Sequence, residues 1–314
     1  MTWLVTGGAG YIGSHVVNSL IQAELPVAVL DDFSSGLHSR CPEGIKVFDS
    51  DICNMTELQL IFDSIDITGV IHCAAKKSVE ESIKYPEIYE KVNVIGTANL
   101  LDASYKSGIR NFVYSSSAAV YGNQEQKMVG EEVVCKPVSP YGKTKLAAEN
   151  LVTKAGVEGL NVCSLRYFNV AGAVNKKLAD TSINNLFPIV LNQLLNGEQP
   201  HIFGTDYETP DGTCIRDYVH IVDLAEVHKE IALKLPDSQV PFVINVGTGL
   251  GISVKEVIDA ITKALNSKIE PILDDRRPGD IGQLVADVQL LKRTLGRVPT
   301  KGLNEIVSSL IATI

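Results

Sequence analysis

The order of the apolar segments constrains the fold of this 314-residue chain more than any other feature. Short β-branched runs alternate with stretches whose apolar residues recur with a period near 3.6. The runs predicted as strands are Trp3–Thr6, Val27–Leu30, Lys46–Phe48, Val70–His72, Phe112–Ser115 and Asn161–Leu165. The helices predicted between them include Ile12–Gln22, Val94–Ser107 and Tyr141–Lys154. This alternation predicts an α/β fold with a doubly wound parallel sheet that is covered by helices on both faces.

The regular alternation of predicted strands and helices ends after Arg166. A loop-rich segment with repeated Asn, Pro and Gly extends to Arg216, before a predicted helix at 222–235 and a predicted strand at 242–246. A last helix is expected near 304–311. We predict that residues 1–166 and 217–247 form the sheet domain, and that 167–216 and 248–314 form a smaller α/β domain. That domain would cover the carboxyl edge of the sheet, where open α/β sheets bind ligands.

Charge and composition exclude several classes of protein. The formal net charge is −9, which argues against capture of nucleic acid or an anionic membrane. No run approaches the roughly 20 apolar residues of a spanning helix, and no signal peptide is recognisable, so we predict a cytoplasmic protein. The six cysteines and six histidines lack metal-ligand spacing, which predicts reduced thiols and no metal site.

A glycine-rich turn lies between the first predicted strand and the first predicted helix. The sequence TGGAGYIGSH puts Gly7, Gly10 and Gly13 in a TGxxGxxG spacing. Glycine permits a tight turn and a close backbone approach to a pyrophosphate, and the helix N-terminus offers free N–H groups. A glycine triplet alone is weak evidence, but its place between a strand and an amphipathic helix predicts a dinucleotide site.

Acidic residues follow the second and third predicted strands. Asp31 and Asp32 lie near the offset of about 20 residues at which a carboxylate accepts the adenosine ribose hydroxyls. A carboxylate there repels a 2′-phosphate, so NAD is favoured over NADP. Asp51 has two interpretations, a contact with the adenine edge or a helix cap.

A tyrosine and a lysine have the spacing of a catalytic pair. In YGKTK, Tyr141 and Lys145 are four residues apart, which places both side chains on one face of a helix. A nearby ammonium and a cationic nicotinamide ring both favour the phenolate, so we expect a lowered pKa for Tyr141 and a role as base. Ser117, at the end of the predicted strand in SSSAAVYG, would hydrogen-bond the substrate hydroxyl. The alternative is a surface Tyr and Lys without function.

Motifs along nearly the whole chain resemble those of the extended short-chain dehydrogenase/reductase family, and within it the group of UDP-glucose 4-epimerases. These motifs are TGGAGYIGSH, AAKKSVEES, SSSAAVYG, SPYGKTK, LRYFNVAGA and RDYVHIVDLA. The resemblance implies a Rossmann-type sheet, tightly held NAD, a UDP-sugar substrate and a homodimer packed through two crossover helices of each subunit.

The resemblance also assigns residues to the two ligands. It implies that Lys145 also donates to the nicotinamide ribose. Further implied NAD contacts are Tyr11, Ile12, Ile52, Cys73, Ala74, Ala75, Lys77, Asn93, Ser115, Tyr167 and Phe168. The implied UDP-sugar contacts are Ser117, Asn169, Asn185, Leu186, Ile202, Phe203, Arg216, Arg277 and Asp280, with the two arginines on the pyrophosphate.

The expected activity is the interconversion of UDP-glucose and UDP-galactose by oxidation at C4, rotation of the 4-keto sugar and re-reduction. Ala118 and Ala119 occupy positions where dehydratase and decarboxylase relatives carry an acid, so elimination of water is not expected. Two alternatives stay open. One is a 4-epimerase of another UDP-sugar, such as an N-acetylhexosamine, a glucuronate or a pentose, a choice that Leu284 leaves undecided. The other is a non-catalytic, NAD-sensing regulator.

Overall fold

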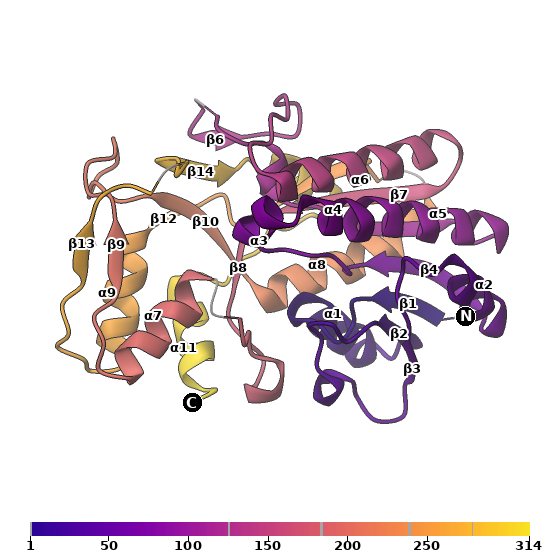
Figure 1. Cartoon of the computed structure of the whole chain (residues 1–314), viewed down its shortest axis with the longest axis horizontal. Coiled ribbons are helices and arrows are strands. Elements are labelled where there is room, and N and C mark those ends of the chain that lie inside the picture. The colour runs from indigo at the N-terminus through magenta and orange to yellow at the C-terminus, as the bar shows by residue number, and fades with distance from the viewer. Residues whose placement is uncertain (1, 125, 183–184, 238–239, 278) are drawn as a thin grey trace.

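A parallel sheet of seven strands organises the first part of the chain (Figure 1). The computed structural model describes residues 2–314 except 125, 183–184, 238–239 and 278. The sheet order is β11-β7-β5-β4-β1-β2-β3. Its strands are β1 (Thr2–Thr6), β2 (Val27–Asp31), β3 (Lys46–Asp49), β4 (Ile67–His72), β5 (Asn111–Ser115), β7 (Asn161–Tyr167) and β11 (Val243–Val246). The strand order reverses between β1 and β4, which is where a doubly wound sheet opens a crevice for a ligand.

Helices cover both faces of this sheet because side chains alternate along each buried strand. On one face Val5 and Val29 pack against α1 (Tyr11–Gln22) and α8 (Ile221–Lys234). On the other face Leu4 and Leu30 pack against α2 (Met55–Ser64), α5 (Gly96–Lys106) and α6 (Pro140–Val157). The sheet thus has a separate apolar core on each face, as the predicted three-layer fold requires.

Short helices complete the first part of the chain. They are α3 (Val79–Lys84), α4 (Pro86–Tyr89) and a π-helical segment, Glu90–Ile95, that leads into α5. Turns of 3-10 helix lie at His38–Arg40, Ala118–Val120, Lys176–Leu178 and Leu235–Asp237.

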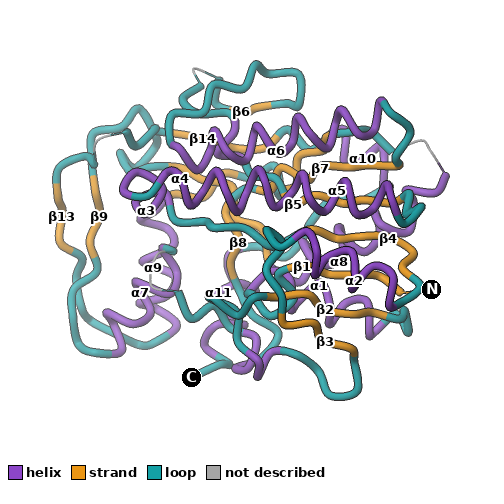
Figure 2. The backbone as a smooth tube through the Cα atoms, turned by 45° about the vertical axis from the view of Figure 1, so that its right-hand side comes forward, coloured by secondary structure: helices purple, strands orange, loops and turns teal. Residues whose placement is uncertain are grey.

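A second group of elements lies beyond the carboxyl edge of the large sheet (Figure 2). Its five-stranded sheet contains β12 (Gly251–Ser253), β10 (Ile215–His220), β14 (Gln283–Ala286) and β6 (Met128–Val129), with β8 (Asn169–Ala171) on β10. A smaller sheet pairs β9 (His201–Phe203) with β13 (Ile272–Asp274). The helices α7 (Leu186–Leu195), α9 (Val254–Ala264) and α11 (Leu303–Ile311) share an apolar core, and α10 (Gln289–Leu295) packs on β11.

The predicted strands and crossover helices of the first part are confirmed, with ends that move by up to three residues. The prediction of a loop-rich segment at 167–216 is wrong over Leu186–Leu195, which forms α7. Pro188 is compatible with this helix because it lies in the first turn, where its missing N–H has no partner to lose. The helix α9 has no counterpart among the predicted elements, although Ser253 and Glu256 form a capping box at its start.

Two strands join elements from both sides of the predicted domain boundaries. β6 comes from the first segment but pairs with β14, and β10 begins before residue 217. The division into 1–166 with 217–247 and 167–216 with 248–314 stays a prediction.

We predict that two leucines of α2 differ sharply in their contribution to stability. Leu58 is fully buried in the core against β1 and β2, whereas Leu60 is 66% exposed on the same helix. Leu58→Ala should lower the free energy of unfolding by about 2–5 kcal/mol, because it leaves a cavity in a packed core. Leu60→Ala should change it by less than about 0.5 kcal/mol. Urea unfolding measures both, and similar losses in the two variants would contradict this packing.

Candidate active site

A cavity of about 400 Å³ lies at the carboxyl edge of the large sheet, where the strand order reverses. Its walls come from the ends of β1, β2, β4 and β7, from the N-terminal turn of α1 and from α6. The predicted NAD residues that line it are Gly7, Gly10, Tyr11, Ile12, Gly13, Asp31, Asp32, Asp51, Ile52, Cys73, Ala74, Ala75, Lys77, Tyr141, Lys145 and Tyr167. Residues spread over most of the sheet domain thus meet in one place.

The glycine-rich turn shapes one wall of this cavity. Gly7 has a φ of +68°, and a Cβ there would lie 2.6 Å from the backbone nitrogen of Ala74. A Cβ on Gly13 would lie 2.1 Å from the carbonyl oxygen of Gly7. No side chain caps the start of α1 at Gly10, so the N-terminal turn of α1 faces the cavity with its positive dipole end. The turn therefore fits the pyrophosphate of a dinucleotide.

The acidic residues after β2 and β3 lie on the wall beside the turn. Asp31 accepts hydrogen bonds from the backbone N–H groups of Ala9 and Phe33, both at 2.9 Å. Burial raises the pKa of its carboxyl group, and these two hydrogen bonds oppose the rise. Asp51 also lines the cavity, while the N-cap of α2 is Asn54. The capping interpretation of Asp51 is therefore wrong for α2, and the adenine contact stays a prediction.

Three of the predicted NAD residues do not line the cavity among the described residues. Asn93 is buried and holds the loop after β4, since its side chain accepts from the N–H of Lys76 and donates to the carbonyl of the same residue. The hydroxyl of Ser115 lies behind the cavity, 2.9 Å from Nε2 of His228. Phe168 packs into a separate apolar cluster with Tyr121. Their side chains support the site from behind.

The predicted catalytic pair lies at the inner end of the cavity. The side chain of Ser139 caps the start of α6 by accepting from the N–H of Gly142, so Tyr141 and Lys145 fall in the first two turns. Both side chains are buried, and both line the cavity. Nζ of Lys145 donates to the carbonyl oxygen of Ser115 at 2.7 Å and lies 4.9 Å from the ring centre of Tyr114. This bond fixes the ammonium between β5 and α6.

Burial governs the pKa of both groups. It raises the pKa of the Tyr141 phenol, and the hydrogen bond with Ser117 opposes the rise. In the chain by itself the loss of hydration on burial is the larger effect on the phenol. The lowering expected from an ammonium together with a cationic nicotinamide ring stays a prediction. Burial also lowers the pKa of Lys145 to about 8, while the charges of Cys73 and Glu149 act in the opposite direction.

Some of the predicted UDP-sugar residues cluster next to β9. The guanidinium of Arg277 stacks 4.6 Å from the ring centre of Phe203 and pairs with Asp280 at 3.0 Å. Arg216 on β10 is the register partner of Leu284 on β14. An exposed arginine beside an aromatic ring and a backbone edge can hold a nucleotide, although within the described residues none of these side chains lines the cavity above.

The other predicted UDP-sugar residues are more dispersed. Asn169 begins β8 and is exposed, and Asn185 donates to Asp180 at 2.7 Å just before α7. Leu186 is partly buried against the core of the helices α7, α9 and α11. Ile202 is buried in that core, which leaves only its backbone for a contact with a ligand.

The comparisons with known proteins agree with this geometry. The sequence pattern of the NAD dependent epimerase/dehydratase family matches residues 3–247. The chain belongs to this family. It is 40% identical over 301 residues to a UDP-glucose 4-epimerase from Azospirillum brasilense. The aligned region covers 94% of this chain and 86% of that relative.

Solved structures of this family superpose on the whole chain. One is a UDP-glucose 4-epimerase from Stenotrophomonas maltophila with bound NAD and formylated UDP-arabinopyranose, with a TM-score of 0.94 and 34% identity over 100% of this chain and 97% of that one. Another is the UDP-Glc/GlcNAc 4-epimerase from Campylobacter jejuni, with a TM-score of 0.86 and 32% identity over 99% and 98% of the two chains.

One wall of the cavity in this epimerase/dehydratase family member was not predicted. Arg40 is buried, lines the cavity and donates to the carbonyl oxygen of Ala179 at 2.6 Å. It thereby holds the segment 180–182, which also lines the cavity. Asp180 of this segment lies 3.9 Å from Nζ of Lys77, across the cavity mouth. The contacts join residues more than 100 positions apart, and no motif or spacing signals them.

Three further findings concern metal sites, membrane spans and cysteines. Among the residues that the structure describes, no group of three or more His, Cys, Asp or Glu side chains could hold a metal ion. In the same part of the chain, every helix is too short or too polar to cross a membrane. All six cysteines are free thiols.

We predict that acid destabilises the chain in part through His228, which lies behind the cavity. Burial lowers the pKa of His228 to about 4 from 6.5. Above about pH 6.5 the imidazole is neutral in both the folded and the unfolded chain, so it has no effect. Between about pH 6.5 and 4 the unfolded chain binds a proton that the folded chain rejects, so stability falls by up to about 1.4 kcal/mol per pH unit.

Urea unfolding at pH 7 and pH 5 measures this loss. We expect His228→Gln to lose less stability than the wild type between these two pH values, since glutamine keeps a polar group opposite Ser115 without titrating. Equal losses in the two proteins would show that His228 is not buried in its neutral form.

Proposed function

We propose that this chain interconverts UDP-glucose and UDP-galactose by NAD-dependent epimerisation at C4. The observation that carries the proposal is the pairing of Tyr141 and Lys145 at the inner end of a cavity shaped for a dinucleotide. The names of the relatives agree with this substrate. Turnover of UDP-galactose to UDP-glucose tests it directly, and the absence of exchange between the two sugars would overturn it.

The chain's own residues supply acid–base chemistry and orientation. When bound, NAD provides the acceptor and donor of a hydride. Tyr141 takes the proton of the sugar hydroxyl at C4 and later returns it, and its hydrogen bond with Ser117 favours the charged form. The carbonyl of Ser115 holds Nζ of Lys145, which lies one turn after Tyr141 on α6. The low dielectric around these buried groups strengthens each electrostatic contact.

Epimerisation requires a firm hold on the nucleotide and freedom for the sugar ring to turn. Arg216 and Arg277 are the groups that we assign to the pyrophosphate, since a guanidinium offers paired donors to phosphate oxygens. We assign Phe203 to the uracil and Asp280 to the uridine ribose. At the sugar end, Ala118 and Ala119 follow Ser117 in a short 3-10 turn and carry no acid that could eliminate water. The lack of an acid in this turn favours reversible oxidation at C4 over elimination of water.

A second copy of the chain is the partner that we propose for the outer face of α3 to α5. Exposed apolar side chains along this segment include Val79, Ile83, Ile88, Ile95 and Tyr105. An exposed apolar face of this kind marks an interface, and a homodimer would bury it in both subunits. Light scattering on a sizing column should give twice the mass of 33.9 kDa. The cytoplasmic location stays a prediction from the sequence.

The alternative to an enzyme is a regulatory protein that binds NAD as a sensor and has no catalytic activity. Such a protein needs the glycine-rich turn but has no use for a tyrosine and a lysine buried together beside it. Retention of Tyr141, Lys145 and Ser117 therefore favours the enzyme.

We predict that Tyr141→Phe keeps the cofactor site and loses turnover. The phenyl ring fills the same space, so NAD binding should stay within about twofold of the wild type. Turnover should fall by on the order of a hundredfold or more, since the proton acceptor is gone. A coupled assay of UDP-galactose conversion and the NAD content of the purified protein measure the two effects. Activity like that of the wild type would contradict the role of Tyr141 as base.

We predict that the size of the side chain at position 284 sets the preference for a 2-acetamido sugar. Leu284 is partly buried beside Phe168 and next to Arg216 in register, on the side of the site that we assign to the substrate. Leu284→Ala should raise the ratio of kcat/KM for UDP-N-acetylglucosamine over UDP-glucose, and Leu284→Tyr should lower it. Turnover on a panel of UDP-sugars measures the ratio. No change in either variant would show that this position does not face the sugar.

A further inference from the structure

A buried carboxylate that belongs to none of the sites above lies directly behind the catalytic pair. Glu149 is on α6, one turn after Lys145, and only 2% of it is exposed. A carboxylate in such a place is costly unless charged and polar partners surround it. Its partners come from the residue that follows β5 and from β7.

The first partner is Ser116, which immediately precedes Ser117. The hydroxyl of Ser116 donates to Oε2 of Glu149 at 2.6 Å, and both groups are buried. The backbone at the end of β5 is thereby tied to α6. Because Ser117 follows in the chain and Tyr141 lies on the same helix as Glu149, this bond limits how far apart the two catalytic side chains can move.

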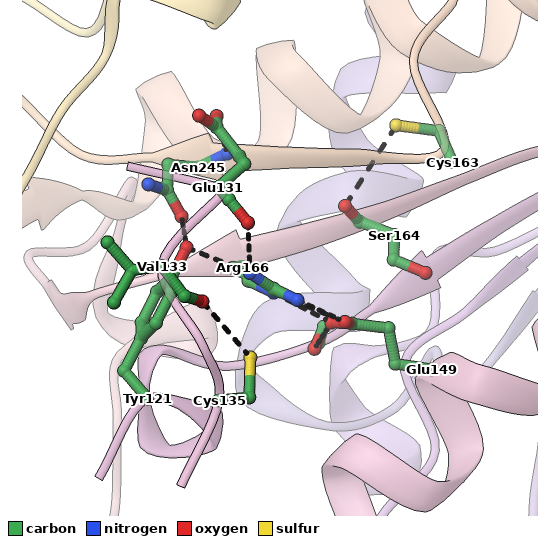
Figure 3. Close-up of polar contacts among 10 residues, drawn as sticks. Tyr121, Glu131, Val133, Cys135, Glu149, Cys163, Ser164, Arg166 and Asn245 are labelled. Carbon is green, nitrogen blue, oxygen red and sulfur yellow. Dashed lines mark hydrogen bonds and ion pairs between the residues drawn. The ribbon is translucent and has the colours of Figure 1, made fainter. Parts of the chain in front are cut away.

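The second partner is Arg166, which immediately precedes Tyr167 at the end of β7. Its guanidinium approaches both carboxylate oxygens of Glu149, with Nε at 3.0 Å from Oε2, and Arg166 is only 5% exposed (Figure 3). Tyr167 lines the cofactor cavity. One carboxylate therefore connects the three elements that carry Ser117, Tyr141 and Tyr167.

The guanidinium also reaches toward the second sheet. Nη1 of Arg166 donates to the hydroxyl of Tyr121 at 3.0 Å, and that hydroxyl donates to Oδ1 of Asn245 at 2.7 Å. Asn245 in turn donates to the carbonyl of Val129 on β6, the strand that pairs with β14. Leu284 lies on β14. The hydrogen bonds thus run from the catalytic helix to the strand beside the proposed sugar site.

We propose that Glu149 is a positioning residue for the reaction, holding Ser117 and Tyr141 at proton-transfer distance through Ser116 and Arg166. The inference rests on the proposed epimerase function. Glu149 is buried and does not line the cavity, so it acts only through its partners. Stability alone is a poor reason for such a pair, since apolar residues of similar size often replace buried ion pairs without loss. Its charge also helps Lys145 to keep its proton against burial.

A double variant separates positioning from stability. Glu149→Gln alone leaves the buried Arg166 charge without a charged partner, so both stability and turnover should fall. Glu149→Gln with Arg166→Met removes both charges, and we expect its Tm to return to near that of the wild type. Its kcat should stay lower by about tenfold or more, because a small misplacement of reacting groups costs that much. KM for UDP-galactose and NAD content should stay within about twofold.

A pair of serine variants provides the matched control. Ser116→Ala removes the hydroxyl that binds Glu149, and kcat should fall by about threefold or more at unchanged KM. Ser164→Ala removes the same atoms from the neighbouring strand β7, where the buried hydroxyl has no hydrogen-bond partner within the described part of the chain. Its kcat should equal that of the wild type. Both measurements use the full chain as purified with NAD.

The outcomes distinguish this inference from the proposed function. If the wild type does not interconvert the two UDP-sugars, the proposed function fails first. If the wild type is active and the double variant recovers both Tm and kcat, Glu149 and Arg166 serve stability alone and the inference is wrong. Equal effects of Ser116→Ala and Ser164→Ala on kcat would overturn it as well, because the hydrogen bond to Glu149 would then carry no function.

Discussion

The close approach of Gly13 to the carbonyl group of Gly7 is the constraint on which the rest of the site depends. A methyl group at Gly13 has no room, since its carbon would lie 2.1 Å from that oxygen. Without side chains between them, β1 and α1 meet in a tight turn that aims the start of the helix at the edge of the sheet. The chain after β4 then passes within contact of Gly7 at Ala74. The cofactor cavity and the catalytic helix α6 are both arranged around this turn between β1 and α1.

The sequence predicts those features of the fold and the site that local patterns encode. Buried strands such as β1 and β5 are short apolar runs, and α1 and α6 have apolar residues at helical spacing. Two site features follow from local backbone geometry alone: the glycine spacing after β1, and the four-residue interval between Tyr141 and Lys145. In the structure the residues of both features line the cavity, as predicted. In each case the residues that define the feature are neighbours along the chain.

Features that depend on burial or on distant contacts were predicted less well. The pKa of Tyr141 rises because of the dielectric around it, which no spacing reveals. Asn93 and Ser115 turn their side chains to the protein rather than to the cavity, since buried polar groups need partners. The helix α7 was not predicted. Asparagine and proline are common both in loops and at the start of a helix, so their presence here did not indicate which of the two forms.

The closure of the cavity by residues 180–182 links cofactor retention to the order of synthesis. A ribosome releases the glycine-rich turn first, and the segment held by Arg40 emerges only after β7. The edge strand β11 and the helix α10 that packs on it follow later still. A nascent chain therefore displays the dinucleotide-binding turn well before it has the wall that encloses the ligand. Enclosure of the nucleotide therefore becomes available only once the chain extends past residue 182.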